Sequence, residues 1–241
     1  MKKYGFLLIL LLVACGKKET SIKKYYFPYA ELTTPQVYKY TDKKNPGSVM
    51  YWYFKTDVKK GDTLLTTCIY DQHFNLTSVF LNDITPTGSS LKQMFVGLGD
   101  SLSMYQCMVK QRDAFNWIIK PGQKLYVAFG MQNEQNTESK EVITERSFEP
   151  KKELLNFNGK EYECILVKEN TSINQVKTNR TVTEEQQRNS YYAEGIGLLQ
   201  FETFNINGTS NIFALEKILT EAEWKQVNPA SVMDSTAATA K

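Results

Sequence analysis

Between residues 25 and 227, aromatic and β-branched side chains alternate with polar ones in short runs. A period of two is typical of antiparallel strands that have one face in water. The runs predict strands at Val49–Thr56, Thr63–Tyr70, Leu76–Ile84, Ser101–Lys110, Lys124–Met131 and Glu141–Phe148. We therefore expect a mainly β protein, an antiparallel meander that forms a half-open barrel or a strongly curved sheet.

Turn and cap residues predict the connections between these strands. Asn158-Gly159 and Asn207-Gly208 each separate two apolar runs, and Asn-Gly readily takes the positive φ angles of a two-residue type I′ turn. Short helices are expected only at Ser89–Phe95 and at Leu219–Trp224, where Thr220 is followed three residues later by Glu. The polar stretch Gln132–Lys140 is expected to be a loop at which a subdomain boundary could fall.

The beginning of the chain has the layout of a secretion signal. Lys2 and Lys3 precede the apolar run Phe6–Ala14, which is too short to cross a bilayer that needs about twenty residues. Leu12–Cys15 resembles the lipobox of bacterial lipoproteins, in which the cysteine sulfur receives a diacylglycerol. That resemblance implies a signal peptide at residues 1–14 and acyl chains such as palmitate on Cys15. An ordinary secretion signal with an incidental cysteine is the alternative.

A lipid on Cys15 would make the membrane the first partner of this chain. Residues 15–24 would then be a polar tether, residues 25–227 the antiparallel β domain, and the small polar residues 228–241 a disordered tail. Gly16 stands where many lipoproteins retained at the inner membrane carry aspartate, and Lys17–Glu19 does not resemble the acidic tract of surface lipoproteins. We expect the periplasmic face of the outer membrane, with the cell surface as the alternative.

The cysteines after residue 15 suggest packing and not chemistry. Cys68, Cys107 and Cys164 each lie in a strand-like run. An exported protein can form disulfides, but an odd number leaves at least one thiol unpaired. We expect three buried thiols that pack as small hydrophobes, with one disulfide and one thiol as the alternative.

Composition and motifs exclude several classes of function. Of the 29 basic residues 25 are lysine. The forked guanidinium of arginine binds phosphate better than a lysine ammonium does, so nucleic acid is not an expected partner. His73, the single histidine, lies beside Asp71 in a predicted turn and is expected to be solvated. The sequence does not single out a pair of acidic residues as the catalytic carboxylates of a glycosidase. Asp100 and Glu202 are no better candidates than the others. We expect no catalytic residues, no metal, no cofactor and no enzyme activity.

Two C-terminal segments carry a resemblance to a family. Phe157–Val167 and Tyr191–Glu202 resemble a pair that recurs in uncharacterised bacterial lipoproteins, where a tyrosine-rich strand enters a YYAxGxGL turn. Those proteins are similar to the half-open barrel of the lipoprotein localisation factors, whose concave face receives acyl chains. In physical terms, Gly195 and Gly197 provide free φ angles at a strand entry, and Tyr191 and Tyr192 cover the edge of a core.

Several strands, such as VMYWYF and NIFALEKIL, are apolar on both faces and so predict a second apolar surface. We therefore favour a non-catalytic, lipid-anchored binding or scaffolding module whose apolar groove holds an apolar ligand or a protein partner. One alternative is a purely structural interaction lipoprotein. Another is a prolyl isomerase, because KKGDTLLTTCIYDQHFN, SSLKQMFVGLGDSLSMY and KPGQKLYVAF resemble immunophilins, although the Phe-Asp-Ser, Gly-Trp and Ile-Pro elements of that family are missing.

Overall fold

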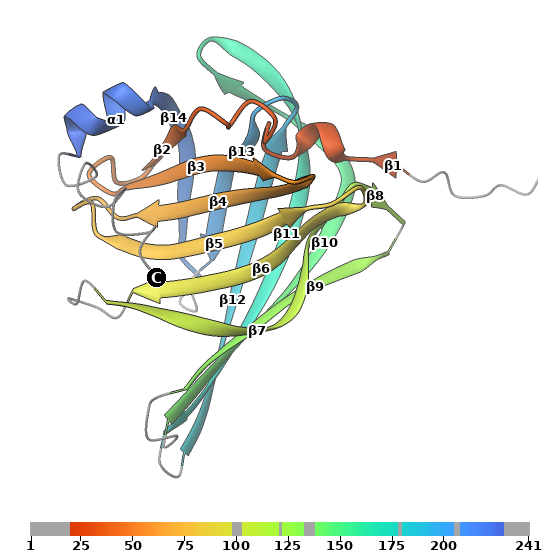
Figure 1. Ribbon diagram of the computed structural model, residues 1–241, viewed down its shortest axis with the longest axis vertical. Coiled ribbons are helices and arrows are strands. Elements are labelled where there is room, and N and C mark those ends of the chain that lie inside the picture. Colours follow the sequence, from red (N-terminus) through yellow and green to blue (C-terminus); the bar gives the residue numbers. More distant parts are fainter. Residues whose placement is uncertain are drawn as a thin grey trace, which may run out of the picture.

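Twelve strands close into one antiparallel barrel in the part of the chain that the computed structural model describes, residues 20–97, 103–120, 122–132, 138–177, 180–204 and 208–228. Their order around the ring is β10-β11-β12-β13-β14-β2-β3-β4-β5-β6-β7-β9, and β9 pairs with β10 to complete it (Figure 1). The prediction of a mainly β antiparallel meander is confirmed. The half-open form was wrong, because the last strand, β14, pairs with the first strand of the ring, β2.

The elements of the structure have these bounds: β1 Thr20–Ser21, η1 Lys23–Tyr25, β2 Gln36–Asp42, β3 Val49–Lys59, β4 Asp62–Tyr70, β5 Leu76–Ile84, β6 Gly88–Gly97, β7 Met104–Asn116, β8 Ile118–Ile119, β9 Lys124–Gln132, β10 Glu138–Phe157, β11 Lys160–Lys177, β12 Arg180–Ala193, β13 Gly197–Phe204, β14 Ser210–Thr220 and α1 Glu221–Val227. The long strands β10, β11 and β12 stand upright in Figure 1 and extend below the shorter strands β3 to β6.

One of the two predicted helices is a strand. Ser89–Phe95 lies within β6, where Leu91 and Met94 are buried. Their helical spacing of three arises because the pairing of β6 with β7 shifts register between Ser90 and Met94, as a β-bulge does. The other helix is confirmed as α1. Thr220 and Glu223 form a complete capping box at its start.

The first Asn-Gly turn is confirmed and the second is wrong in length. Asn158 and Gly159 have φ angles of 52° and 75° between the paired residues Phe157 and Lys160. At the other site β13 and β14 do form a hairpin, but Phe204 pairs with Ser210, so five residues connect them.

Packing of the core explains the register in which β13 pairs with β14. Phe201 pairs with Phe213, and their rings stack inside the barrel with centroids 5.1 Å apart. A two-residue turn at Asn207-Gly208 would shift the pairing by one residue and turn one of these rings outward. Asn207 itself lies outside the described residues.

The folded part begins earlier than residue 25. Thr20 and Ser21 pair with Ile119 and Ile118, and Ile22 is buried, so only the first part of the predicted tether lies outside the described residues. Of the predicted loop Gln132–Lys140, residues 133–137 lie outside as well, and the strands on either side of it pair with one another in the same barrel. Residues 229–241 of the predicted tail are also outside.

The segment from Ile22 to Leu32, here called the N-terminal plug, packs into one end of the barrel. The ring centroids of Phe27 and Phe54 lie 4.3 Å apart, and those of Tyr26 and Phe115 lie 4.9 Å apart. Figure 1 shows this segment crossing the top of the barrel. Aromatic side chains therefore fill this end of the interior. None of the helices in the described residues has the length and apolar character to cross a membrane.

Candidate functional site

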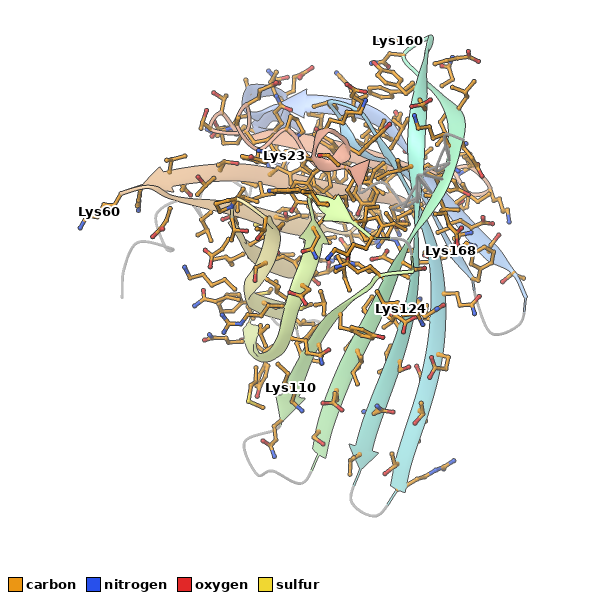
Figure 2. All side chains as sticks on the ribbon, turned by 90° about the vertical axis from the view of Figure 1, so that its right-hand side faces the viewer. Lys23, Lys60, Lys110, Lys124, Lys160 and Lys168 are labelled. Atoms are coloured by element: carbon orange, nitrogen blue, oxygen red, sulfur yellow. The ribbon has the colours of Figure 1, made fainter. Side chains whose placement is uncertain are left out.

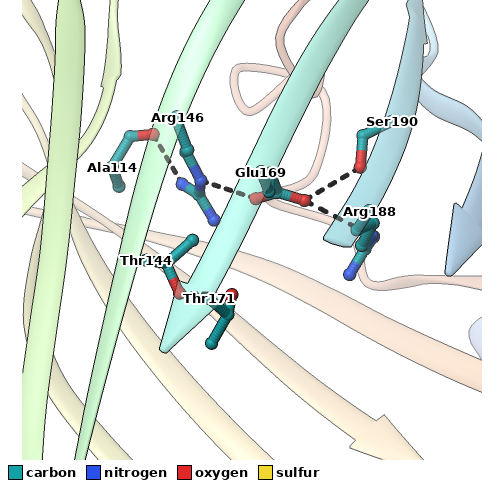
Figure 3. A network of polar contacts seen from close by, with 7 residues as sticks. All are labelled: Ala114, Thr144, Arg146, Glu169, Thr171, Arg188 and Ser190. Carbon is teal, nitrogen blue, oxygen red and sulfur yellow. Dashed lines mark hydrogen bonds and ion pairs between the residues drawn. The ribbon is translucent and has the colours of Figure 1, made fainter. Parts of the chain in front are cut away.

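A row of three charged side chains crosses the inner wall of the barrel. Arg146 on β10 pairs in register with Glu169 on β11, and Glu169 pairs with Arg188 on β12. Figure 3 shows the three side chains pointing toward one another. Side chains alternate between the two faces of a strand, so these residues share the inner face with Phe148, Val167 and Tyr192, which belong to the same core.

The carboxylate of Glu169 is the centre of the row. Arg146 donates from Nε to its Oε1 at 2.6 Å, and Ser190 donates from Oγ to its Oε2 at 2.9 Å. The Arg188 Nε lies 3.3 Å from the same Oε2. Arg146 also donates from a terminal nitrogen to the carbonyl oxygen of Ala114 at 2.6 Å. Both oxygens of Glu169 are therefore engaged, while each guanidinium keeps further donors.

The row carries one net positive charge. Burial alone would raise the pKa of Glu169, but the charges of Arg146 and Arg188 outweigh it and hold that pKa below its usual value. The carboxylate is thus ionised at neutral pH and neutralises one of the two guanidinium groups. An uncompensated charge in an apolar interior is expensive unless something pairs with it.

A cavity of about 160 Å³ lies against this row. Its lining combines the three charged side chains with the aromatic rings of Trp52, Phe54 and Phe115 and with the polar side chains of Thr67 and Asn82. Arg146 and Arg188 retain 25% and 27% of their side-chain surface, and both line the cavity, so that surface faces it. The site is a small, mostly apolar chamber under the aromatic plug, with the charged row on one wall.

Two donors at this cavity have no acceptor in the described part of the chain. They are Nε1 of Trp52, a side chain that is 91% buried, and Nε of Arg188, whose distance to Glu169 lacks the angle of a hydrogen bond. The Arg188 guanidinium lies over the Trp52 ring at 5.6 Å and over the Phe201 ring at 4.1 Å. These cation–π contacts fix the guanidinium in place but leave its N–H groups unused.

The residues expected to matter from the sequence lie elsewhere. Cys15 and Asp100 are outside the described residues. His73 is exposed in a turn, where its backbone N–H donates to Asp71 Oδ1 at 2.8 Å, and Glu202 lies on β13 away from the charged row. Among the described residues no cluster of three His, Cys, Asp or Glu could hold a metal ion.

The cysteine prediction is confirmed for two of the three residues. Cys107 and Cys164 are buried thiols, and burial raises the pKa of Cys164 to about 12. Cys68 is also a thiol but is only half-buried. None of the three lines the charged cavity.

The roles inferred for the glycine and tyrosine motif are confirmed. Gly195 and Gly197 have φ angles of 74° and 93°, and Tyr191 and Tyr192 are both 9% exposed in the main core. Gly195 donates its N–H to the Lys24 carbonyl oxygen at 3.0 Å. The motif therefore receives the N-terminal plug, a use that its sequence did not reveal.

Solved structures of two proteins share this fold. A protein described as a lipoprotein from Parabacteroides distasonis is 15% identical with a TM-score of 0.50, covering 84% of this chain and 100% of its own. An exported protein with a YmcC-like fold from Bacteroides fragilis is 16% identical with a TM-score of 0.50, covering 81% of this chain and 99% of its own. No protein-family model matches the sequence, and no curated protein matches it either. At such identities the likeness concerns the barrel fold.

Proposed function

We propose that this chain is a non-catalytic, lipid-anchored binding protein of the cell envelope, whose barrel interior receives the anionic group of a small ligand. The observation that supports this most is the Arg146–Glu169–Arg188 row, which carries one net positive charge and lines a cavity. The aromatic rings around the cavity would take the apolar part of the ligand. The ligand is therefore a small amphiphilic anion, such as an aromatic or short-chain carboxylate.

Geometry favours this ligand class over a long apolar molecule. An apolar cavity of about 150 Å³ holds a molecule the size of benzene, and this cavity is of similar volume. A carboxylate placed here could accept from the terminal nitrogens of Arg146 and Arg188, whose partly exposed side chains line the cavity. The short helix that the resemblance to immunophilins requires at Ser89–Phe95 is strand β6, so that part of the resemblance does not support an isomerase.

Replacing Arg188 with Gln should weaken binding of a small carboxylate by roughly 10- to 100-fold, because a hydrogen bond to a charged group contributes about 1.5–3 kcal/mol. Benzoate and hexanoate, titrated calorimetrically and by quenching of Trp fluorescence, are suitable probes. Arg112→Gln is the matched control, because Arg112 is exposed on β7 and does not line the cavity. Equal affinity for both variants and the parent protein would contradict an anion site, and an interaction scaffold would be the better description.

The proposed anchor has a separate test. Changing Cys15 to Ser should move the protein from the membrane pellet into unprocessed precursor or soluble material, and should abolish labelling with a radioactive fatty acid. Cys68→Ser should change neither result, because Cys68 lies on β4 within the barrel. Unchanged labelling of the Cys15 variant would refute the lipid attachment.

We place the anchored protein at the periplasmic face of the outer membrane. Support comes from Gly16, which replaces the aspartate of lipoproteins retained at the inner membrane, and from the absence of an acidic tract after Cys15. Fractionation of the two membranes, followed by protease treatment of intact cells, tests this placement. Protection from the protease in the outer-membrane fraction is the expected result.

A further inference from the structure

A second, larger cavity lies beside the start of the N-terminal plug and apart from the charged row. Its volume is about 710 Å³, within the range of sites that hold small-molecule ligands. Apolar side chains line it: Ile22, Tyr25, Ile119, Phe148 and Ile165. Ile118, next to it on β8, is 50% exposed. The side of the barrel that carries β1 and β8 faces the viewer in Figure 2.

Lysines make the lining of this cavity basic. Lys24, Lys120, Lys124 and Lys152 contribute to it together with one carboxylate, Glu149. Lys124 forms an ion pair with Glu145 at 2.7 Å, and Lys152 forms one with Glu163 at 2.5 Å. Lys24 pairs with Glu194. About half of each of these three lysine side chains is exposed. Exposed pairs of this kind contribute little free energy, so the ammonium groups can turn to another anion.

The position of the cavity relative to the anchor suggests the source of that anion. Ser21 and Ile22 form part of its wall, and Thr20 pairs with Ile119 at its edge. Cys15 lies five residues before Thr20, and an extended chain of that length spans at most about 17 Å. A lipid on Cys15 would therefore hold the cavity close to the surface of the same leaflet.

We propose that this cavity binds one anionic phospholipid of the leaflet in which the protein is anchored. One acyl chain lies along Phe148 and Ile165, and the phosphate lies among Lys24, Lys124 and Lys152. The proposal rests on the lipid anchor of the proposed function but not on the anion site inside the barrel. Its consequence is a fixed orientation, with the plugged end of the barrel turned toward the membrane.

The test uses the full chain, extracted from membranes in mild detergent and analysed by native mass spectrometry. Mixed micelles supply phosphatidylglycerol and phosphatidylcholine in equal amounts. We expect one bound phospholipid per chain, predominantly phosphatidylglycerol. Replacing Lys24, Lys124 and Lys152 with Gln should reduce phosphatidylglycerol binding by about fivefold for each lysine. The expected result includes little change in the weaker binding of phosphatidylcholine.

Matched variants distinguish binding at this cavity from a general effect of positive surface charge. Lys92, Lys110 and Lys217 also form exposed ion pairs with carboxylates but do not line the cavity, and their Gln variants should bind as the parent does. Ser147→Trp fills the cavity and should abolish binding of either lipid, whereas Ser139→Trp, toward the other end of β10, should not. Thermal melts monitor folding of each variant.

The outcomes distinguish the two proposals. Absence of bound phospholipid on a membrane-anchored chain, or equal losses in the two lysine sets, would overturn the phospholipid site and leave the anchor intact. A chain that carries no covalent lipid in the same mass spectra would refute the anchor itself. Loss of phosphatidylglycerol only in the cavity variants would support the site.

Discussion

Replacing Glu169 with Gln should lower the free energy of unfolding by about 3 kcal/mol, because it leaves two partly buried guanidinium groups without a counter-charge. Glu169 is 5% exposed and is the only acidic partner that Arg146 and Arg188 have among the described residues. The Gln side chain can still accept one hydrogen bond from Arg146, but it carries no charge. Urea denaturation, followed by Trp fluorescence, measures the loss.

A neighbouring glutamate provides the control for this change. Glu145 precedes Arg146 on β10 and pairs with Lys124 at 2.7 Å on the outer face. Glu145→Gln should cost less than about 1 kcal/mol, since exposed ion pairs contribute little. If the two variants unfold at the same urea concentration, the row does not hold a buried charge.

The same carboxylate should make the stability of the barrel depend on pH. The two arginines hold the pKa of Glu169 below its usual value in the folded state. A lowered folded pKa means that the contribution is fully present above the unfolded value of about 4.3 and is lost as the pH falls through the folded pKa. The parent protein should therefore lose stability below about pH 4 more steeply than Glu169→Gln does.

Gly197→Ala should lower the free energy of unfolding by roughly 2–6 kcal/mol. Its φ of 93° is strained for any residue with a side chain, which costs about 1–3 kcal/mol. An added Cβ would also lie 2.5 Å from Cδ1 of the Phe27 ring, and such overpacking costs about 1–3 kcal/mol more. Thermal and urea unfolding measure the total.

The same substitution at Gly195, in the same turn, distinguishes the cost of backbone strain from the cost of the clash with Phe27. Its φ is 74°, and nothing lies within 4 Å of an added Cβ. Gly195→Ala should therefore cost only the backbone strain, about 1–2 kcal/mol. Equal losses for the two variants would mean that Phe27 does not pack on Gly197, and that the N-terminal plug is held in another way.

The alternation of side chains predicted the strands well, because a period of two reflects burial of one face and needs no knowledge of neighbours. It could not predict closure of the ring. That depends on pairing between residues distant in sequence, such as Gln36 with Thr220 and Asp42 with Phe213. The spacing of apolar residues also gave a wrong prediction in β6, where a bulge produces the spacing of a helix.

The charged row was missed although its signal is present in the sequence. Arginine is rare in this chain, and two of its four arginines fall at inward positions of strands, in step with Phe148 on β10 and Tyr192 on β12. Attention to a charge that interrupts an apolar face would have identified Arg146, Glu169 and Arg188 one by one. Their alignment requires the register of β10, β11 and β12, which the sequence does not specify.

The pairing of β2 with β14 has a consequence for how the chain folds. Gln36, near the beginning of the described chain, pairs with Thr220 near its end. Loop-closure entropy makes such distant pairings slow to form. While the chain folds, the early strands β2 to β7 can form hairpins in turn, but β2 keeps an open edge until β14 is available to pair with it. The barrel should therefore close late, in a single slow step after synthesis, with β2 exposed to aggregation until then.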